Sequence, residues 1–317
     1  MGAYVVRRIL TSIPLLLGVT LILFLLMHLM PGGPLAAYAQ NPHIRPEDLA
    51  KIRHIMGLDK PLWMQYFFWL GAMLTGNFGA SLTSGQPVLA MFLSRLPNTL
   101  MLMGASLVVS LIIGVLLGVA SAIKQYSAFD FTVTTLAFIG YSLPVFWFGV
   151  VLMLIFAADL RWFPAGGIHS IASHGGILDL AWHMVLPVTM LSIVSVAGWS
   201  RYMRSSMLEV IRQDYVRMAR AKGLSEQVVI MKHAFRNALI PLVTLIALSL
   251  PGLLGGAIMT EQIFGWPGVG RLFFHALAES DYPLMMAILT ISAVAVVVSN
   301  LLADIVYAAL DPRIRYD

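Results

Sequence analysis

Few side chains in this sequence are of the types that carry covalent chemistry. The 317 residues include no cysteine, which excludes thiolate nucleophiles, thiolate metal sites and disulfides. Ser142 and His183 could pair as nucleophile and base in an intramembrane hydrolase, but such a pair must lie at one membrane depth. Ser142 falls in the middle of an apolar run and His183 near the end of another, and no Gly-x-Ser-x-Gly elbow occurs. A hydrolase is therefore the less favoured interpretation.

Metal or nucleotide chemistry would have to come from the histidines or from a phosphate-binding loop. Of the eight histidines, His169, His174 and His183 lie on or near one segment between apolar runs. Their spacing matches no compact pair of metal ligands, so hydrogen-bonding interfacial histidines are the simpler interpretation. A Walker-type loop needs Gly-Lys before Ser or Thr, and the chain has no Gly-Lys pair. We expect no metal site and no bound nucleotide.

A third pattern of interest lies in the basic segment 201–236. Asp214 is a suitable N-cap and Gly223 a suitable C′ residue, which predicts a short helix at 215–222. Its small alanines would let another backbone approach closely, so docking into a second protein is one interpretation. A basic loop that only fixes membrane topology is the other, and the residues alone favour it. A second helix is expected to begin after Ser225.

The rest of the chain has the composition of a membrane protein. It is 59% hydrophobic and 11% charged, whereas soluble domains carry roughly 25% charged residues. Six stretches lack Asp, Glu, Lys and Arg and are long enough for a hydrocarbon core of about 30 Å. Continuous apolar runs indicate helices, because barrel strands alternate. The six predicted spans are 9–30, 98–123, 131–158, 180–200, 237–260 and 284–303. The fold is predicted to be all-α.

Charge distribution predicts the orientation of these spans. With a cytoplasmic N-terminus, 13 of the 20 lysines and arginines lie in inside segments, as the positive-inside rule requires. A further uncharged run at 62–78 is marginal in length and is interpreted as an interfacial helix. The first run is longer than the roughly 7–15 residues of a signal-peptide core, so we expect it to be retained. Trp162, Trp182 and Trp266 fall at the outer margins, where an aromatic belt would lie.

The chain then divides into three parts in sequence order. Residues 1–30 form the N-terminus and first span, and 31–97 form an extracytoplasmic element with an aromatic run that predicts a folded segment. Residues 98–317 form a core of five spans with a cytoplasmic loop at about 201–236. Proline in mid-span releases backbone carbonyls, so Pro144 and Pro187 are candidate pathway residues, although packing kinks are the simpler explanation. Proline at 241 should bend the start of the fifth span.

The run from Asp214 to Ser225, with the following Lys232-His233-Ala234-Phe235-Arg236-Asn237-Ala238-Leu239-Ile240-Pro241, resembles the coupling loop of bacterial ABC-transporter permeases. The resemblance is to the B-type permease of the oligopeptide/dipeptide/nickel importer branch. It extends to Gly57-Leu58-Asp59-Lys60-Pro61-Leu62, Asn77-Phe78-Gly79, Leu96-Pro97-Asn98-Thr99-Leu100, Trp266-Pro267-Gly268-Val269-Gly270, Asp281-Tyr282-Pro283 and the ending from Ala309 to Tyr316. Two departures are Arg217-Met218-Ala219 in place of a Glu-Ala-Ala start, and Gly33 in place of an Asp in a Pro-Gly-Asp-Pro turn.

The resemblance implies a type I ABC importer permease fold in a bacterial inner membrane, with both termini cytoplasmic. It implies half of a pathway for oligopeptides or dipeptides, with a nickel or glutathione importer of the same branch as the alternative. The implied partners are a homologous permease, two cytoplasmic ATPases and an extracytoplasmic peptide-binding protein. ATP and Mg²⁺ would be bound by the ATPases, so this chain would hold no cofactor and would be no enzyme. Closure of the ATPases would move the loop helix and tilt the spans.

The resemblance also directs attention to two sets of residues. Residues expected to couple the chain to an ATPase are Arg217, Ala219, Arg220, Gly223, Leu224 and Ser225. Residues that could line or gate the pathway are Ser142, Pro144, Pro187 and Glu261. Glu261 at the outer end of the fifth span could meet substrate, but a solvated terminus is the simpler expectation.

Overall fold

A computed structural model gives the fold of the chain. It describes residues 2–30, 32–35, 38, 44–170, 175–254 and 257–310, with side chains from 6 to 303 except residue 254. The described part is helical, with one isolated antiparallel bridge between Ala80 and Pro87 and no named strand. The all-α prediction is therefore confirmed.

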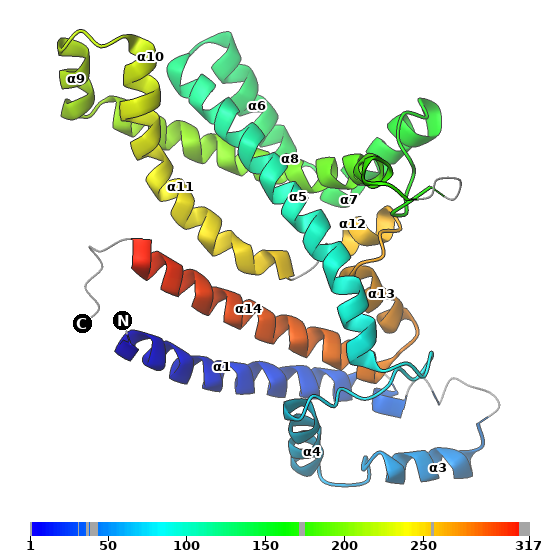
Figure 1. Cartoon of the computed structure of the whole chain (residues 1–317). Coiled ribbons are helices and arrows are strands. Elements are labelled where there is room, and N and C mark those ends of the chain that lie inside the picture. The colour runs from blue at the N-terminus through cyan, green and yellow to red at the C-terminus, as the bar shows by residue number, and fades with distance from the viewer. Residues whose placement is uncertain are drawn as a thin grey trace. The chain divides into compact units, whose positions relative to one another are not determined.

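Figure 1 shows the order of the helices along the chain. The α-helices are α1 (Gly2–Leu29), α3 (Pro46–Ile55), α4 (Leu62–Leu74), α5 (Val88–Ile123), α6 (Ala128–Ser142), α7 (Val145–Leu152), α8 (Ile177–Ile211), α9 (Asp214–Ala221), α10 (Glu226–Val228), α11 (Arg236–Ser249), α12 (Ile258–Ile263), α13 (Val269–Ala278) and α14 (Tyr282–Leu310). Short 3₁₀ segments are η1 (Gly33–Leu35) and η4 (Leu250–Leu254), and π-helical segments are η2 (Met153–Asp159) and η3 (Val229–Phe235).

Among the described residues, five helices are long and apolar enough to cross a membrane, and a bent pair makes a sixth crossing if it is counted as one span. The five are Val6–Leu29, Val88–Ile123, Ile177–Ile211, Glu226–Leu253 and Tyr282–Ala303. At 13 residues, α4 is too short to span, which agrees with its prediction as a helix outside the hydrocarbon core. The fifth span starts earlier than predicted because η3 and α11 continue directly from α10.

The third span is bent by 104° between α6 and α7, at Pro144, where a packing kink was expected. Leu143 adopts an extended conformation, with φ −78° and ψ 132°. The ring of Pro144 disfavours a helical conformation for the residue before it, which explains why α6 stops there. Pro187 lies inside the unbroken helix α8, and Pro241 lies inside α11, which is preceded by the π-helical η3 rather than by a break.

The chain forms two compact units, one of residues 1–99, 254–258 and 267–317 and the other of residues 100–253 and 259–266. In the first unit α1 and α14 run side by side (Figure 1). Helix α4 is tied to α1 by hydrogen bonds of Thr20 with Tyr66 (2.9 Å) and of His28 with Gln65 (3.0 Å). The buried cluster around Phe24 and Tyr66 continues to Val88 and to Met285 of α14.

Motifs that are far apart in the sequence meet in this first unit. Asn98 donates to the carbonyl of Pro267 at 2.9 Å, and the amide of Val269 donates to the Thr99 hydroxyl at 2.8 Å. Asp281 is fully buried and accepts hydrogen bonds from Ser81, Thr83 and the amide of Leu284 at the start of α14. One carboxylate therefore holds the 75–87 segment to the start of α14. We call residues 75–87 together with Asp281 the Asp281 turn.

In the second unit, α8 is the central helix, packed by α6, α7 and α11. Helix α5 approaches it closely at two glycines. A methyl group at Gly118 would lie 2.6 Å from the carbonyl oxygen of Ser200, and one at Gly114 would lie 2.5 Å from the Cβ of Trp199. Both distances are shorter than real carbon contacts allow, so the two helices need glycine at these positions.

Candidate functional site

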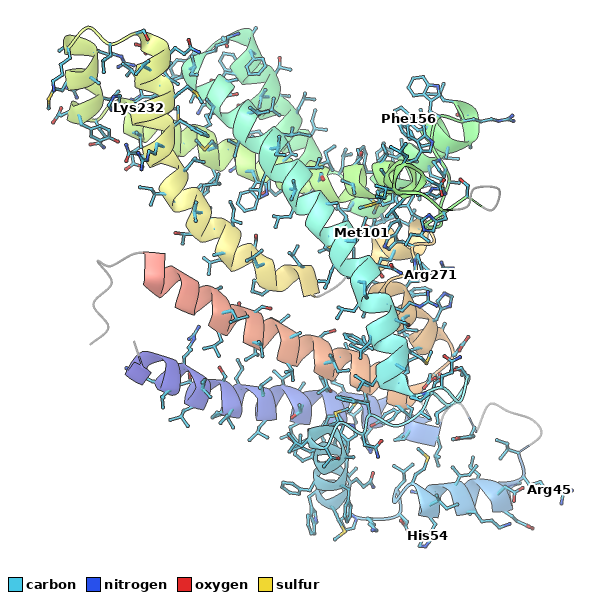
Figure 2. All side chains as sticks on the ribbon, in the orientation of Figure 1. Arg45, His54, Met101, Phe156, Lys232 and Arg271 are labelled. Carbon is cyan, nitrogen blue, oxygen red and sulfur yellow. The ribbon has the colours of Figure 1, made fainter. Side chains whose placement is uncertain are left out.

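The predicted coupling residues fall on a helical hairpin at the end of α8, formed by α9, the turn at Gly223, α10 and η3 (Figure 1). We call residues 213–235 the α9 hairpin. Its interior is a small apolar cluster of Val216, Ala219 and Val229, against which Val210 of α8 packs. Figure 2 labels Lys232, an exposed residue of the η3 arm. The hairpin is therefore a packed structure with its own core.

The turn of the hairpin depends on Gly223. Its φ is +75°, and the amide of Gly223 donates to the carbonyl of Arg220 at 2.9 Å. Because an L-residue in this conformation is strained, the position requires glycine, as expected for a C′ residue. The prediction of Asp214 as N-cap is wrong by one residue, since Gln213 occupies the cap and Asp214 begins the helix. At that first position the carboxylate still complements the helix dipole.

A bidentate ion pair crosses the turn on the outside of the hairpin. Arg220 donates from Nη2 to Glu226 Oε1 at 2.7 Å and from Nε to Oε2 at 3.1 Å. These hydrogen bonds raise the pKa of the Arg220 guanidinium above its usual value. Parallel hydrogen bonds of this kind fix the orientation of both groups. Arg220, expected to contact an ATPase, is therefore already bound within its own hairpin.

The outward face of α9 carries the residues that a partner would meet. Tyr215 and Met218 are 41% and 55% exposed, and Leu224 after the turn is 41% exposed. Arg217 lies beside them with most of its side chain in solvent, near Asp214 at 3.5 Å. An apolar face this exposed on a helix of eight residues is costly to leave in water. Its burial requires a partner surface.

The sequence analysis did not single out Tyr215 and Met218. It listed Ala219 among the residues expected to couple the chain to an ATPase. Ala219 is 5% exposed and packs inside the hairpin, so its small side chain brings α9 close to η3 of the same chain. Val216 and Ala219 are spaced i, i+3, and so are Tyr215 and Met218, one position earlier. This spacing could have distinguished the inward face of α9 from its outward face. Ser225 serves as the cap residue of α10 through its carbonyl, which accepts from the amide of Val229 at 3.0 Å.

The second unit also contains a cavity of about 830 Å³ between α6, α8 and α11. Tyr141 of α6, Arg201 and Glu209 of α8, and Pro241 of α11 are among its lining residues. Arg204 also lines it and holds Asp130 of α6 with two hydrogen bonds of 2.7 Å each. Asp130, 3% exposed, further accepts from the amide of Tyr126 at 3.0 Å. The ion pair ties α6 to α8 beside the cavity and was not predicted.

The four predicted pathway residues do not line this cavity. The Ser142 hydroxyl donates to the carbonyl of Phe138 at 2.9 Å, and Pro144 caps α7 at the bend. Pro187 is buried inside α8. Glu261 is fully buried on α12, so the expectation of a solvated terminus is wrong. Their assignment to the pathway stays a prediction.

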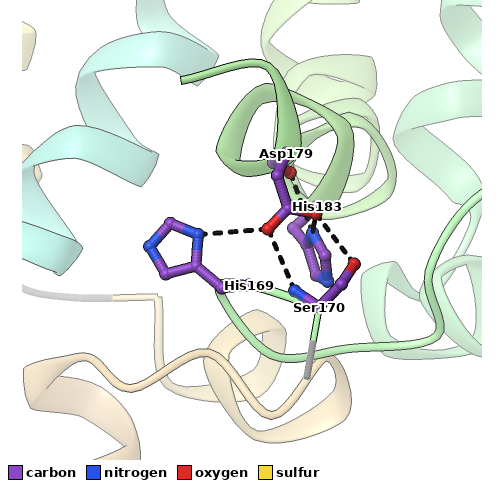
Figure 3. Close-up of polar contacts among 4 residues, drawn as sticks. All are labelled: His169, Ser170, Asp179 and His183. Atoms are coloured by element: carbon purple, nitrogen blue, oxygen red, sulfur yellow. Dashed lines mark hydrogen bonds and ion pairs between the residues drawn. The ribbon is translucent and has the colours of Figure 1, made fainter. Parts of the chain in front are cut away.

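Ser142 and His183, weighed as a hydrolase pair and disfavoured, each form hydrogen bonds with other groups. His183, with 5% exposure, bonds the carbonyl of Asp179 at 2.8 Å through Nδ1. Figure 3 shows that His169, Ser170 and His183 surround the Asp179 carboxylate. Among the described residues no group of three or more His, Cys, Asp or Glu could hold a metal ion. His174 lies outside the described residues.

Two of the three predicted belt tryptophans are exposed, and their place in the belt stays a prediction. Trp162 and Trp182 are 56% and 50% exposed, as expected for side chains at an interface. Trp266 is fully buried, packed with Leu102 and Val188 in the second unit, so its assignment to the belt is wrong. A buried tryptophan in a loop fills a core rather than anchoring the chain in lipid.

The apolar spans define a multi-pass membrane protein. The hairpin that follows the fourth span presents an exposed apolar face to a second protein. The chain belongs to the family of binding-protein-dependent transport system inner membrane components, which it matches over residues 114–316. Residues 1–103 match the N-terminal region of the same type of component. The resemblance to ABC permeases of this branch is thereby confirmed, and the protein is a multi-pass protein of the inner membrane.

Relatives match along the full chain. It is 45% identical over 317 residues to the oligopeptide transport system permease protein AppB of Bacillus subtilis, covering 100% of both chains. It is 39% identical to the di/tripeptide transport system permease protein DppB of Pseudomonas aeruginosa, covering 100% of this chain and 99% of the relative. It is 37% identical to the dipeptide transport system permease protein DppB of Escherichia coli, covering 99% and 98%.

Proposed function

We propose that this chain forms half of the transmembrane pathway of an ATP-driven peptide importer, and that the α9 hairpin transmits the motion of an ATPase to the spans. The exposed face of Tyr215, Met218 and Leu224 carries this proposal. The hairpin is internally packed and continuous with α8 and α11, so a force applied to that face would reach two spans. The names of the relatives support peptides as the substrate class.

The remaining parts of the assembly follow from the same family. A homologous permease would complete the pathway, two ATPase subunits would bind ATP and Mg²⁺, and an extracytoplasmic binding protein would deliver peptide. This chain would then carry no catalytic group. Both termini and the α9 hairpin would face the cytoplasm, since that orientation places 13 of 20 basic residues inside.

In this assembly Arg217 and Leu224 would contact the ATPase directly. The roles of the other predicted residues would be indirect: Ala219 would pack the hairpin, while Arg220, Gly223 and Ser225 would hold its turn. Rigidity matters here because a loose hairpin would absorb the ATPase motion instead of passing it to α8 and α11.

The experiment compares Gly223→Val with Gly76→Val in the assembled transporter. The two glycines are matched, because each follows a helix at C′, with φ of +75° and +78°, and an added Cβ would meet no atom within 4 Å at either. Each substitution should strain its turn by about 1–2 kcal/mol or more. Only Gly223→Val should lose co-purifying ATPase or uncouple ATP hydrolysis from peptide uptake.

The readouts are ATPase retained on the purified permeases, substrate-stimulated hydrolysis and uptake of peptide into proteoliposomes. Both variants should insert, because no span is altered. If Gly223→Val keeps all three quantities normal, the hairpin does not couple the ATPase. If both variants lose ATPase equally, the effect is one of general folding and the assignment also fails.

A further inference from the structure

The cavity between α6, α8 and α11 contains two charged side chains that neither the fold nor the coupling function uses. Its volume of about 830 Å³ lies in the range of small-molecule sites, roughly 300–1,000 Å³. It contains three charged side chains, Arg201, Arg204 and Glu209, all from the last third of α8. This is the part of the helix that leads into the α9 hairpin.

The three charged side chains differ in the groups that they contact. Arg204 is neutralised by Asp130 through two hydrogen bonds of 2.7 Å. Among the residues that the structure describes, Arg201 forms no ion pair; its guanidinium lies over the rings of Phe138 and Tyr141, at 5.2 and 5.8 Å from their centroids. Contact with two aromatic faces orients a guanidinium without using its hydrogen-bond donors. Arg201 therefore keeps its donors for an anion.

Glu209 is the complementary group. It is exposed, lines the same cavity and has no ion-pair partner within the described part of the chain. It follows Arg201 by eight residues on the same helix, which places the two backbones about 12 Å apart along the axis. An extended peptide spans at most about 3.3–3.6 Å per residue, so three residues span about 10 Å. The separation suits the two charged ends of a short peptide.

We propose that this cavity binds a short peptide by both of its termini, with Arg201 taking the carboxylate and Glu209 the ammonium group. The inference rests on the proposed function, since it assigns peptide as the ligand. Arg201 forms parallel hydrogen bonds with the carboxylate, and Tyr141 packs beside the peptide. Because the cavity recognises only the two termini of the peptide, it does not select among peptide side chains. A pathway that carries peptides of many sequences requires this.

The test measures binding to the complete transporter in nanodiscs of phosphatidylcholine, without ATP and without the binding protein. A photoreactive analogue of tri-alanine is cross-linked to the complex, and three competitors are titrated: tri-alanine, its C-terminal amide and its N-acetyl derivative. Arg201→Gln and Glu209→Gln remove one charge each while keeping the side chains close in size. Arg212→Gln, at the C-cap position directly after the same helix and outside the cavity, is the control.

The expected result is a crossed pattern. Arg201→Gln should weaken competition by tri-alanine and its N-acetyl derivative about tenfold and leave the amide unchanged. Glu209→Gln should weaken tri-alanine and its amide to a similar degree and leave the N-acetyl derivative unchanged. Arg212→Gln should have no effect. General damage to the protein cannot produce this crossing, because it would weaken all three competitors alike.

Three results would overturn the proposal. Equal weakening of all competitors would mean that Arg201 and Glu209 only support the structure, and no weakening would mean that they do not touch peptide. If tri-alanine fails to compete, and anionic phosphatidylglycerol binds in a manner that Arg201→Gln abolishes, the cavity is a lipid site. None of these results depends on ATPase association, so the Gly223→Val experiment can still support the proposed function when this inference fails.

Discussion

The Asp281 turn in the first unit and the α9 hairpin in the second both hold a bend of the chain through one carboxylate. Asp281 is fully buried and accepts hydrogen bonds from two hydroxyls and an amide of its own chain. Glu226 of the hairpin is 57% exposed at its side chain and meets one arginine. The buried turn is complete within the chain, whereas the hairpin leaves an apolar face open. We therefore look for function in the α9 hairpin, whose apolar face is exposed, and not in the Asp281 turn.

Asp281→Ala should give the largest loss of stability of any change at these two bends. It leaves the buried Ser81 hydroxyl and the buried amide of Leu284 without this acceptor, and removes one from the exposed Thr83, at a cost of roughly 2–4 kcal/mol. Thermal unfolding of the purified chain in detergent measures this. Glu279→Ala, an exposed acid two residues earlier, should change stability by less than about 0.5 kcal/mol. Equal effects would show that the Asp281 turn contributes no special stability.

Ala219→Leu should open the α9 hairpin. Three added carbons have no room beside Val216 and Val229, and overpacking costs about 1–3 kcal/mol. Hydrogen exchange of the hairpin amides should rise, while that of α8 above the hairpin stays slow. Met218→Ala, on the exposed face of the same helix, should leave exchange unchanged but weaken retention of the ATPase. If Ala219→Leu left exchange unchanged, the inward packing of α9 would be contradicted.

Arg220→Gln should have the smallest effect. Its pair with Glu226 is 38% and 57% exposed, and exposed pairs contribute about 0–1 kcal/mol. Exchange of the Gly223 amide, which bonds the Arg220 carbonyl, should rise by less than about fivefold, and high salt should mask the difference. The double change Arg220→Glu with Glu226→Arg should recover the wild-type rate. A loss as large as that of Ala219→Leu would place the ion pair among the main supports of the hairpin.

Local features of this fold could be predicted from the sequence. Apolar runs located the spans, and the glycine at 223 located the turn, because glycine adopts a φ near +75° without the strain that other residues suffer. The cap was misplaced by one residue, because Asp is a preferred cap type and Gln is not, yet Gln213 occupies the cap without a capping hydrogen bond from its side chain. The inward and outward faces of α9 could have been separated by their spacing.

Tertiary features could not be predicted in this way. Asp130 and Arg204 are separated by 74 positions, and nothing local pairs them. The bend at Pro144 is stabilised where α7 packs on α8, since a methyl group at Gly149 would lie 2.4 Å from the sulfur of Met190. Trp266 and Glu261 looked like interfacial groups but are buried by residues distant in sequence. The cavity with Arg201 and Glu209 is likewise lined by α6, α8 and α11, which are separate segments of the sequence.

The most direct test of the account is site-specific cross-linking from the outward face of α9. The chain has no native cysteine, so Met218→Cys introduces a single thiol on a side chain that is 55% exposed. Met259→Cys, at a 61% exposed position on α12, is the matched control. In membranes that contain the whole transporter, a short thiol cross-linker should join the Met218→Cys chain to an ATPase subunit. It should form no cross-link between the Met259→Cys chain and an ATPase. Cross-linking from Met259→Cys but not from Met218→Cys would contradict the account.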